Sequence, residues 1–152
     1  MDEVQLDGLR DVNGFAPIGD YGVLGDGRGT ALVAGDGSVD WWAVPRLDSE
    51  PAFAALLDPE RGGCVQLRPV ATNATSTRRY VPDTNLLETT FTTATGQVRI
   101  TDSLKVGSPS RCRTVRVWSA RWSGLSEVLR RVACVVRRGL EVPGLPRLVA
   151  LA

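Results

Sequence analysis

The stretch from Asp36 to Ser49 gathers the side chains with the most chemistry in this sequence. It interleaves carboxylates, indoles and a guanidinium, namely Asp40, Trp41, Trp42, Arg46 and Asp48. A sugar needs this combination, because its hydroxyls pair with polar groups while the C–H faces of the ring lie on an aromatic plane. These five residues either bind a sugar or form a face that docks on another domain. In the second case Arg46 pairs with a carboxylate and stabilises the bend at Pro45.

The adjacent indoles of Trp41 and Trp42 face opposite ways if this stretch is a strand. One indole then belongs to the core and the other points outward. The outward indole is either a platform for a sugar ring or part of a contact with another domain, since Trp is enriched at the centres of interfaces.

Short runs of apolar and β-branched residues, separated by Gly and Asp, predict strands as the elements that position these side chains. The Asp-Gly pairs at 26–27 and 36–37 supply the positive φ angles of tight hairpins. The predicted strands are 21–24, 30–34, 38–44, 64–69, 76–81, 86–94, 97–104 and 114–120. Ser49-Glu50-Pro51 is typical of a helix start and predicts one short helix over 52–57. The expected fold class is mainly β, an antiparallel β-sandwich.

Histidine is absent from all 152 residues, which excludes Ser-His-Asp and Cys-His catalysis and any metal site built on imidazole. Acid–base chemistry would depend on carboxylates, which glycosidases hold about 5 to 9.5 Å apart. Glu88 and Asp102 fall on different predicted strands, at what look like ordinary sheet positions. The three cysteines are widely spaced and suggest neither a disulfide framework nor a zinc site. The sequence therefore predicts no catalytic residue, no metal site and no cofactor.

Composition fits one globular domain, with 43% hydrophobic and 23% charged residues. No run approaches the roughly 20 apolar residues of a membrane span, and the acidic N-terminus lacks signal-peptide features. We therefore expect a cytoplasmic protein with no membrane partner. Residues 1–106 carry nine Lys and Arg against fifteen Asp and Glu, whereas residues 107–152 carry nine Arg against two Glu. The basic part has no nucleic-acid-binding motif, so no nucleic-acid partner is expected.

Three stretches carry a resemblance to a known family. They are Pro17–Arg28, Asp36–Ser49 and Arg79–Phe91, within a similarity that runs from about Gly14 to Arg116. This region resembles the N-terminal domain of bacterial trehalase-like and glucoamylase-like proteins of glycoside hydrolase family 15. The resemblance implies a supersandwich-like fold joined in cis to a C-terminal barrel of paired α-helices. It also implies that two glutamates of that barrel hydrolyse α-glucosides such as trehalose with inversion.

The resemblance divides the chain into an N-terminal tail at 1–13, a β-sandwich at 14–117 and a divergent basic tail at 118–152. No segment corresponds to the barrel, so we expect a truncated, non-catalytic chain with an incomplete sandwich. A shifted reading frame and a truly divergent ending both remain open as explanations of the tail. The expected role is to pack on the catalytic barrel and shape its mouth. The alternative is a small carbohydrate-binding module for α-glucoside sugars.

Overall fold

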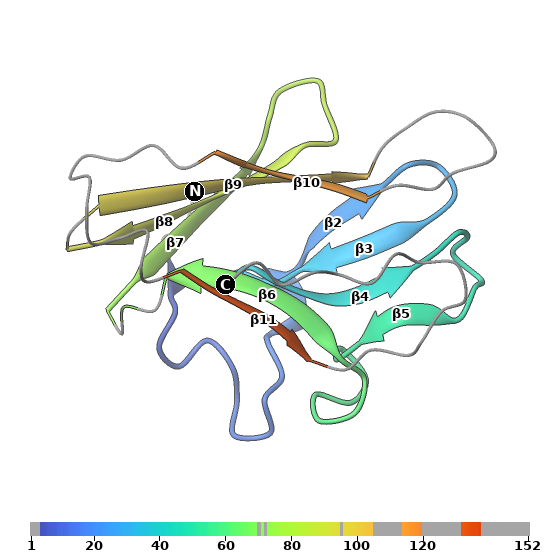
Figure 1. Ribbon diagram of the computed structural model, residues 1–152, viewed down its shortest axis with the longest axis horizontal. Helices are drawn as coiled ribbons and strands as arrows, with labels where there is room; N and C mark the ends of the chain where they lie inside the picture. The colour runs from blue at the N-terminus through green and yellow to red at the C-terminus, as the bar shows by residue number, and fades with distance from the viewer. Residues whose placement is uncertain are drawn as a thin grey trace.

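The computed structural model describes residues 4–69, 71, 73–94 and 96–104, and the backbone of two strands at 114–119 and 132–137. These residues form two antiparallel sheets that face each other (Figure 1). Sheet A has the order β1-β7-β8-β9-β10, with the bounds Val4–Gln5, Thr75–Tyr80, Leu87–Thr93, Gly96–Leu104 and Thr114–Ser119. Sheet B has the order β11-β6-β4-β3-β2, with the bounds Val132–Arg137, Cys64–Pro69, Ser38–Ala43, Thr30–Val33 and Gly22–Gly25. An additional strand, β5 (Pro51–Ala54), pairs with β4, and one 3-10 turn, η1, spans Ile18–Asp20.

The predicted antiparallel β-sandwich is confirmed. Each of the eight predicted strands is present, and its ends are displaced by at most one residue. The two Asp-Gly turns have the expected geometry, with φ of 83° at Gly27 and 77° at Gly37. No helix in the described part of the chain is long and apolar enough to cross a membrane.

Two strands at the ends of the chain were not predicted. β1 pairs with β7 in sheet A. β11 lies in the basic tail and pairs with β6, from Val132 opposite Pro69 to Arg137 opposite Cys64. The other residues beyond 119 lie outside the described part, so the expectations about them stay predictions.

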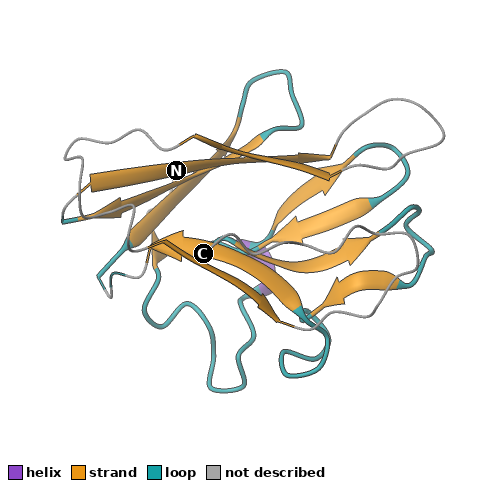
Figure 2. Cartoon of the chain, in the orientation of Figure 1, coloured by secondary structure: helices purple, strands orange, loops and turns teal. Residues whose placement is uncertain are grey.

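The helix expected over 52–57 is wrong, because this segment is strand and loop (Figure 2). Phe53 on β5 is buried and stacks on Trp42 of β4, with ring centroids 6.1 Å apart. The segment pairs antiparallel with β4, Phe53 opposite Trp42, and the Ala54 amide donates to the carbonyl oxygen of Gly62 at 2.8 Å. Tertiary packing has therefore overridden a weak local helix signal.

Two groups of buried side chains hold the sheets together. The first contains Leu6, Leu67, Ala74, Phe91, Val98 and Ile100, and the second contains Leu24, Ala31, Val33, Val39, Phe53, Leu87 and Leu104. Both groups combine residues of the two sheets. Because side chains alternate along a strand, the sequence neighbours of these residues on β2 and β3 point away from the core. On β4 a register shift against β3 lets both Val39 and Trp42 face this core.

Thr89 on β8 is fully buried, yet its hydroxyl has no hydrogen-bond partner within the described residues. Such a hydroxyl has lost its water without compensation, so the isosteric change Thr89→Val should raise the free energy of unfolding by about 1 kcal/mol. Thr90, on the opposite face of β8, accepts a hydrogen bond from Arg99, and Thr90→Val is the control with little expected change. Urea unfolding measures both variants. A loss of stability in Thr89→Val contradicts this account.

Candidate functional site

The turn between β3 and β4 presses the Asp-Gly-Ser sequence against β6. A Cβ added at Gly37 would overlap the carbonyl oxygen of Leu67 and lie 3.0 Å from the Phe91 ring. The Gly37 carbonyl also accepts the Leu67 amide at 3.3 Å. Glycine is required here, because it adopts the positive φ freely and has no side chain to place. The turn thereby fixes Asp36 and the start of β4 relative to β6.

The guanidinium of Arg10 joins the carboxylates of Asp36 and Asp40. Its Nε donates to Asp36 Oδ2 at 2.7 Å, and its Nη2 donates to Asp40 Oδ2 at 2.9 Å and to Asp36 Oδ1 at 3.2 Å. Its Nη1 donates to the carbonyl oxygen of Gly14 at 3.0 Å. Burial alone would lower the pKa of Arg10, but the two carboxylates raise it overall, so the guanidinium stays charged. One cation therefore bridges two carboxylates that are only 2% and 0% exposed.

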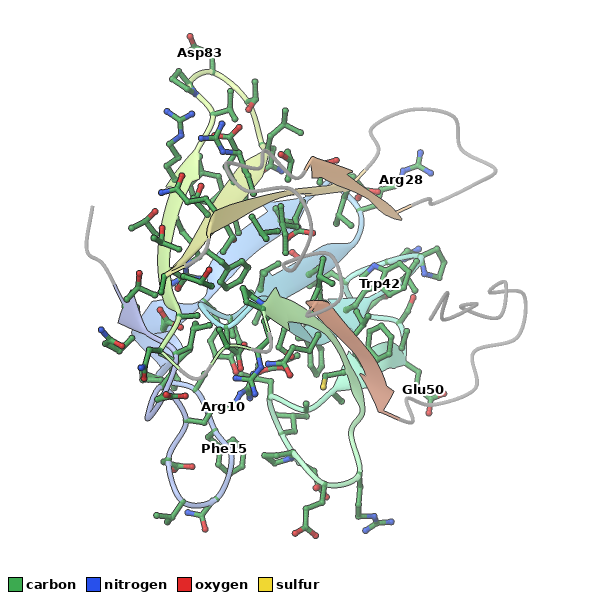
Figure 3. All side chains as sticks on the ribbon, turned by 60° about the vertical axis from the view of Figure 1, so that its left-hand side comes forward. Arg10, Phe15, Arg28, Trp42, Glu50 and Asp83 are labelled. Atoms are coloured by element: carbon green, nitrogen blue, oxygen red, sulfur yellow. The ribbon has the colours of Figure 1, made fainter. Side chains whose placement is uncertain are left out.

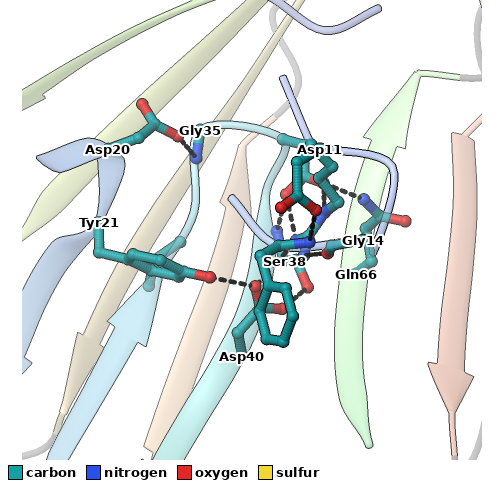
Figure 4. A network of polar contacts seen from close by, with 12 residues as sticks. Asp11, Gly14, Asp20, Tyr21, Gly35, Ser38, Asp40 and Gln66 are labelled. Carbon is teal, nitrogen blue, oxygen red and sulfur yellow. Dashed lines mark hydrogen bonds and ion pairs between the residues drawn. The ribbon is translucent and has the colours of Figure 1, made fainter. Parts of the chain in front are cut away.

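Three neutral side chains complete this polar network, which Figure 4 shows around Asp40. The Tyr21 hydroxyl donates to Asp40 Oδ2 at 2.7 Å, and the Ser38 hydroxyl donates to Asp40 Oδ1. The Gln66 amide donates to Asp36 Oδ2 at 2.8 Å. Burial and the bond to Asp40 raise the pKa of Tyr21, which keeps its phenol a donor. Every oxygen of the two carboxylates accepts a hydrogen bond, so the network is a structural bridge between the N-terminal segment and sheet B.

The two adjacent indoles point to opposite faces of sheet B. Trp42 (Figure 3) packs against the second core group and stacks on Phe53. Trp41 therefore faces outward, where it lies opposite Leu32 on β3, and Leu32 neighbours Val23 on β2. Val23 is 50% exposed, while Leu32 and Trp41 are half-buried. We call Val23, Leu32 and Trp41 the outer apolar row.

Arg46 and Asp48 pair with each other in the loop that follows β4. Arg46 Nε and Nη2 donate to the two Asp48 carboxylate oxygens at 2.9 and 3.1 Å, and both side chains are 71% exposed. The hydrogen bond from Arg46 lowers the pKa of Asp48. Asp40 is held by Arg10 instead, and Trp42 packs in the core. The five residues singled out in the sequence therefore do not converge on one polar cluster in this structure.

Arg10 and Gln66 belong to the network but were not singled out in the sequence. Arg10 lies 26 residues from Asp36 and 30 from Asp40, in a segment expected to be a tail, and no local pattern connects these positions. The one sequence signal that could have indicated this network is the Asp-Gly-Ser turn. Two carboxylates on a tight turn and the strand it opens need a cationic partner if they are buried.

Glu88 and Asp102 do not form a carboxylate pair. Asp102 on β9 is buried and lies opposite Leu87, whose side chain is in the core. Glu88 is the next residue of β8, so it points to the outer face, where its carboxylate binds Arg79 at 2.6 and 2.8 Å. A two-carboxylate glycosidase mechanism needs both groups to flank one scissile bond within the same site, about 5 to 9.5 Å apart, and two carboxylates on opposite faces of a sheet do not share such a site. No cluster of three His, Cys, Asp or Glu side chains suited to a metal occurs among the described residues.

These features define a two-sheet antiparallel β-sandwich domain with a buried Arg–Asp bridge and an apolar row on one outer face. A family model described as "Trehalase-like, N-terminal" matches residues 12–128, further than the predicted end of the similarity at Arg116. The chain belongs to this trehalase-like N-terminal family, as its sequence resemblance predicted.

Curated relatives support this membership. The chain is 41% identical to a trehalase of Mycolicibacterium smegmatis over 128 residues, which cover 81% of this chain and 19% of the relative. It is 39% identical to a trehalase of Mycobacterium tuberculosis over 127 residues, covering 81% and 18%. Trehalase 1 of Sulfolobus acidocaldarius is 35% identical over 103 residues, covering 68% and 17%. The chain thus spans about a fifth of the length of these relatives. No solved structure matches the chain.

Proposed function

We propose that this chain acts as the non-catalytic N-terminal domain of an α-glucoside hydrolase of glycoside hydrolase family 15, of the trehalase or glucoamylase type. In this proposal the sandwich packs on a catalytic barrel in cis and shapes its mouth. The family membership and the much greater length of the related trehalases support it. The single observation that carries the docking role is the outer apolar row.

The outer apolar row is suited to a contact with another domain. Outward positions of an antiparallel sheet with one face in water are usually polar. Here three neighbouring strands instead place Val23, Leu32 and Trp41 side by side on that face. An aromatic side chain at the centre of such a contact is typically worth about 2 kcal/mol or more when truncated. The row would lose its remaining exposure against a partner surface.

The alternative, a small carbohydrate-binding module, is favoured by one observation, the outward indole of Trp41. A sugar site also needs polar groups beside the aromatic plane to bind the ring hydroxyls. The nearest candidates are already engaged, since Asp40 bonds to Arg10 and Arg46 bonds to Asp48. The docking role is therefore the better supported of the two.

A chimera tests the docking role, with this chain in place of the matched N-terminal region of the Mycolicibacterium smegmatis trehalase. We expect Trp41→Ala to weaken the domain contact by about 2 kcal/mol, lowering the thermal inactivation midpoint of the chimera and its trehalose hydrolysis. The control is Thr77→Ala on sheet A, which should leave both measurements unchanged. An active chimera that is insensitive to Trp41→Ala contradicts docking through the row.

The isolated chain separates the remaining alternatives. It should release no glucose from trehalose, maltose or soluble starch above the buffer level. Glucose release would contradict the non-catalytic assignment. Saturable quenching of Trp fluorescence by glucose oligomers, abolished by Trp41→Ala, would instead support the carbohydrate-binding module.

A further inference from the structure

The stretch Arg79–Phe91 carries a family resemblance, yet the proposed docking role uses none of its side chains. Its first part ends β7 in sheet A and continues into the loop that leads to β8, with Asp83 at the tip (Figure 3). From there, two of its side chains reach the backbone of β2, in sheet B. β2 is the last strand of that sheet, and within the described residues it pairs only with β3.

The Tyr80 hydroxyl occupies both edge-facing backbone groups of Val23. It accepts a hydrogen bond from the Val23 amide at 2.8 Å and donates one to the Val23 carbonyl oxygen at 2.9 Å. These two groups point the same way, and they are the pair that a further antiparallel strand would bind. The Asn85 amide donates to the carbonyl oxygen of Gly25, two residues along β2. Side chains therefore occupy three pairing groups of this edge, the amide and carbonyl of Val23 and the carbonyl of Gly25.

The neighbouring contacts fix β7 relative to β2. Arg78 donates to the carbonyl oxygen of Val33 at 3.0 Å and to Asp20 Oδ1 at 2.5 Å. Asp20, which ends η1 just before β2, accepts the Gly35 amide at 2.8 Å through its other oxygen. The Leu87 side chain lies directly over Gly22, where a Cβ would collide with it. These contacts leave the Tyr80 hydroxyl facing the edge of β2.

We propose that Tyr80 and Asn85 form an edge clasp that closes β2 to strand addition, and that opening the clasp lets β2 pair antiparallel with β2 of a second copy of this chain. Exposed strand edges present unpaired N–H and C=O groups that readily pair with another chain. A two-fold axis midway between the Val23 residues of the two copies would set these groups opposite the same groups of the other copy. It would also make the outer apolar row continuous across both copies, because Val23 ends the row at this edge. The clasp thus keeps partner strands away from the β2 edge, a role that goes beyond the proposed docking role.

The test compares the wild-type chain with the double variant Tyr80→Phe, Asn85→Ala by sedimentation velocity across a concentration series. The variant keeps the aromatic ring but removes both hydrogen-bonding groups. We expect its dimer dissociation constant to be at least tenfold lower than any measured for the wild type. Adding Val23→Lys, which places a charge on the pairing edge, should restore the wild-type behaviour. The matched control is Val23→Lys alone, which measures the contribution of the outer apolar row.

Three results overturn the proposal. A folded double variant that associates no more than the wild type shows that the edge needs no clasp. If the double variant associates more strongly, and Val23→Lys weakens this association no more than it weakens that of the wild type, the contact lies elsewhere. If the double variant does not fold, amide hydrogen exchange of the wild type decides: the Val23 amide should be protected like the paired amides of β2, and exchange at the rate of an open loop overturns the clasp.

Discussion

Replacing Arg10 by methionine is expected to lower the free energy of unfolding by about 3 kcal/mol or more. The change leaves the carboxylates of Asp36 and Asp40 buried without their cation, while the methionine keeps most of the side-chain volume. A loss of this size is a large share of the roughly 5 to 15 kcal/mol that stabilises a typical domain. Urea unfolding followed by Trp fluorescence measures it.

Two further variants show whether the loss comes from the buried charges. Arg28→Met, at an exposed position in the β2–β3 turn, is the matched control and should change stability by less than about 0.5 kcal/mol. Adding Asp40→Asn to Arg10→Met should recover part of the loss, because it removes one of the uncompensated charges. Equal unfolding midpoints for Arg10→Met and Arg28→Met would contradict the bridging role of Arg10.

The second large effect is expected for Gly37→Ala. The added methyl group meets the Leu67 carbonyl oxygen, a rigid backbone atom of β6. The positive φ of 77° adds a penalty of about 1 to 2 kcal/mol for any residue with a Cβ. Together these effects should lower the free energy of unfolding by about 3 kcal/mol or more, near the upper range of single substitutions.

Gly27→Ala separates the two contributions. Gly27 has a similar φ of 83°, but nothing lies within 4 Å of an added Cβ. It should therefore cost only the conformational penalty, about 1 to 2 kcal/mol. If Gly37→Ala and Gly27→Ala have the same urea midpoint, β6 shifts at little cost to accommodate the added methyl group. The close contact between the turn and β6 would then not contribute to stability.

Local patterns in the sequence were sufficient to predict every strand between residues 21 and 104 except β5, because alternation and Asp-Gly turns act over a few residues. The segment 52–57 was predicted wrongly because this prediction also depended on a local pattern alone. Its short apolar run suits a helix or a buried strand equally, and the choice was made by the stacking of Phe53 on Trp42. The pairing of β11 with β6 joins residues more than 60 positions apart, and no local sequence pattern predicts it.

The candidate site also depends partly on local sequence and partly on tertiary structure. The sequence by itself determined that Trp41 and Trp42 face opposite sides of a strand, since the side-chain period of a strand is two. Only the packing of β4 on the second core group decided that Trp42 lies inside and that Trp41 joins Leu32 and Val23 on the outer face. The sequence also presented Asp40 as a candidate for binding. Its partner Arg10 comes from 30 residues away, because a buried carboxylate must find a cation wherever the folded chain supplies one.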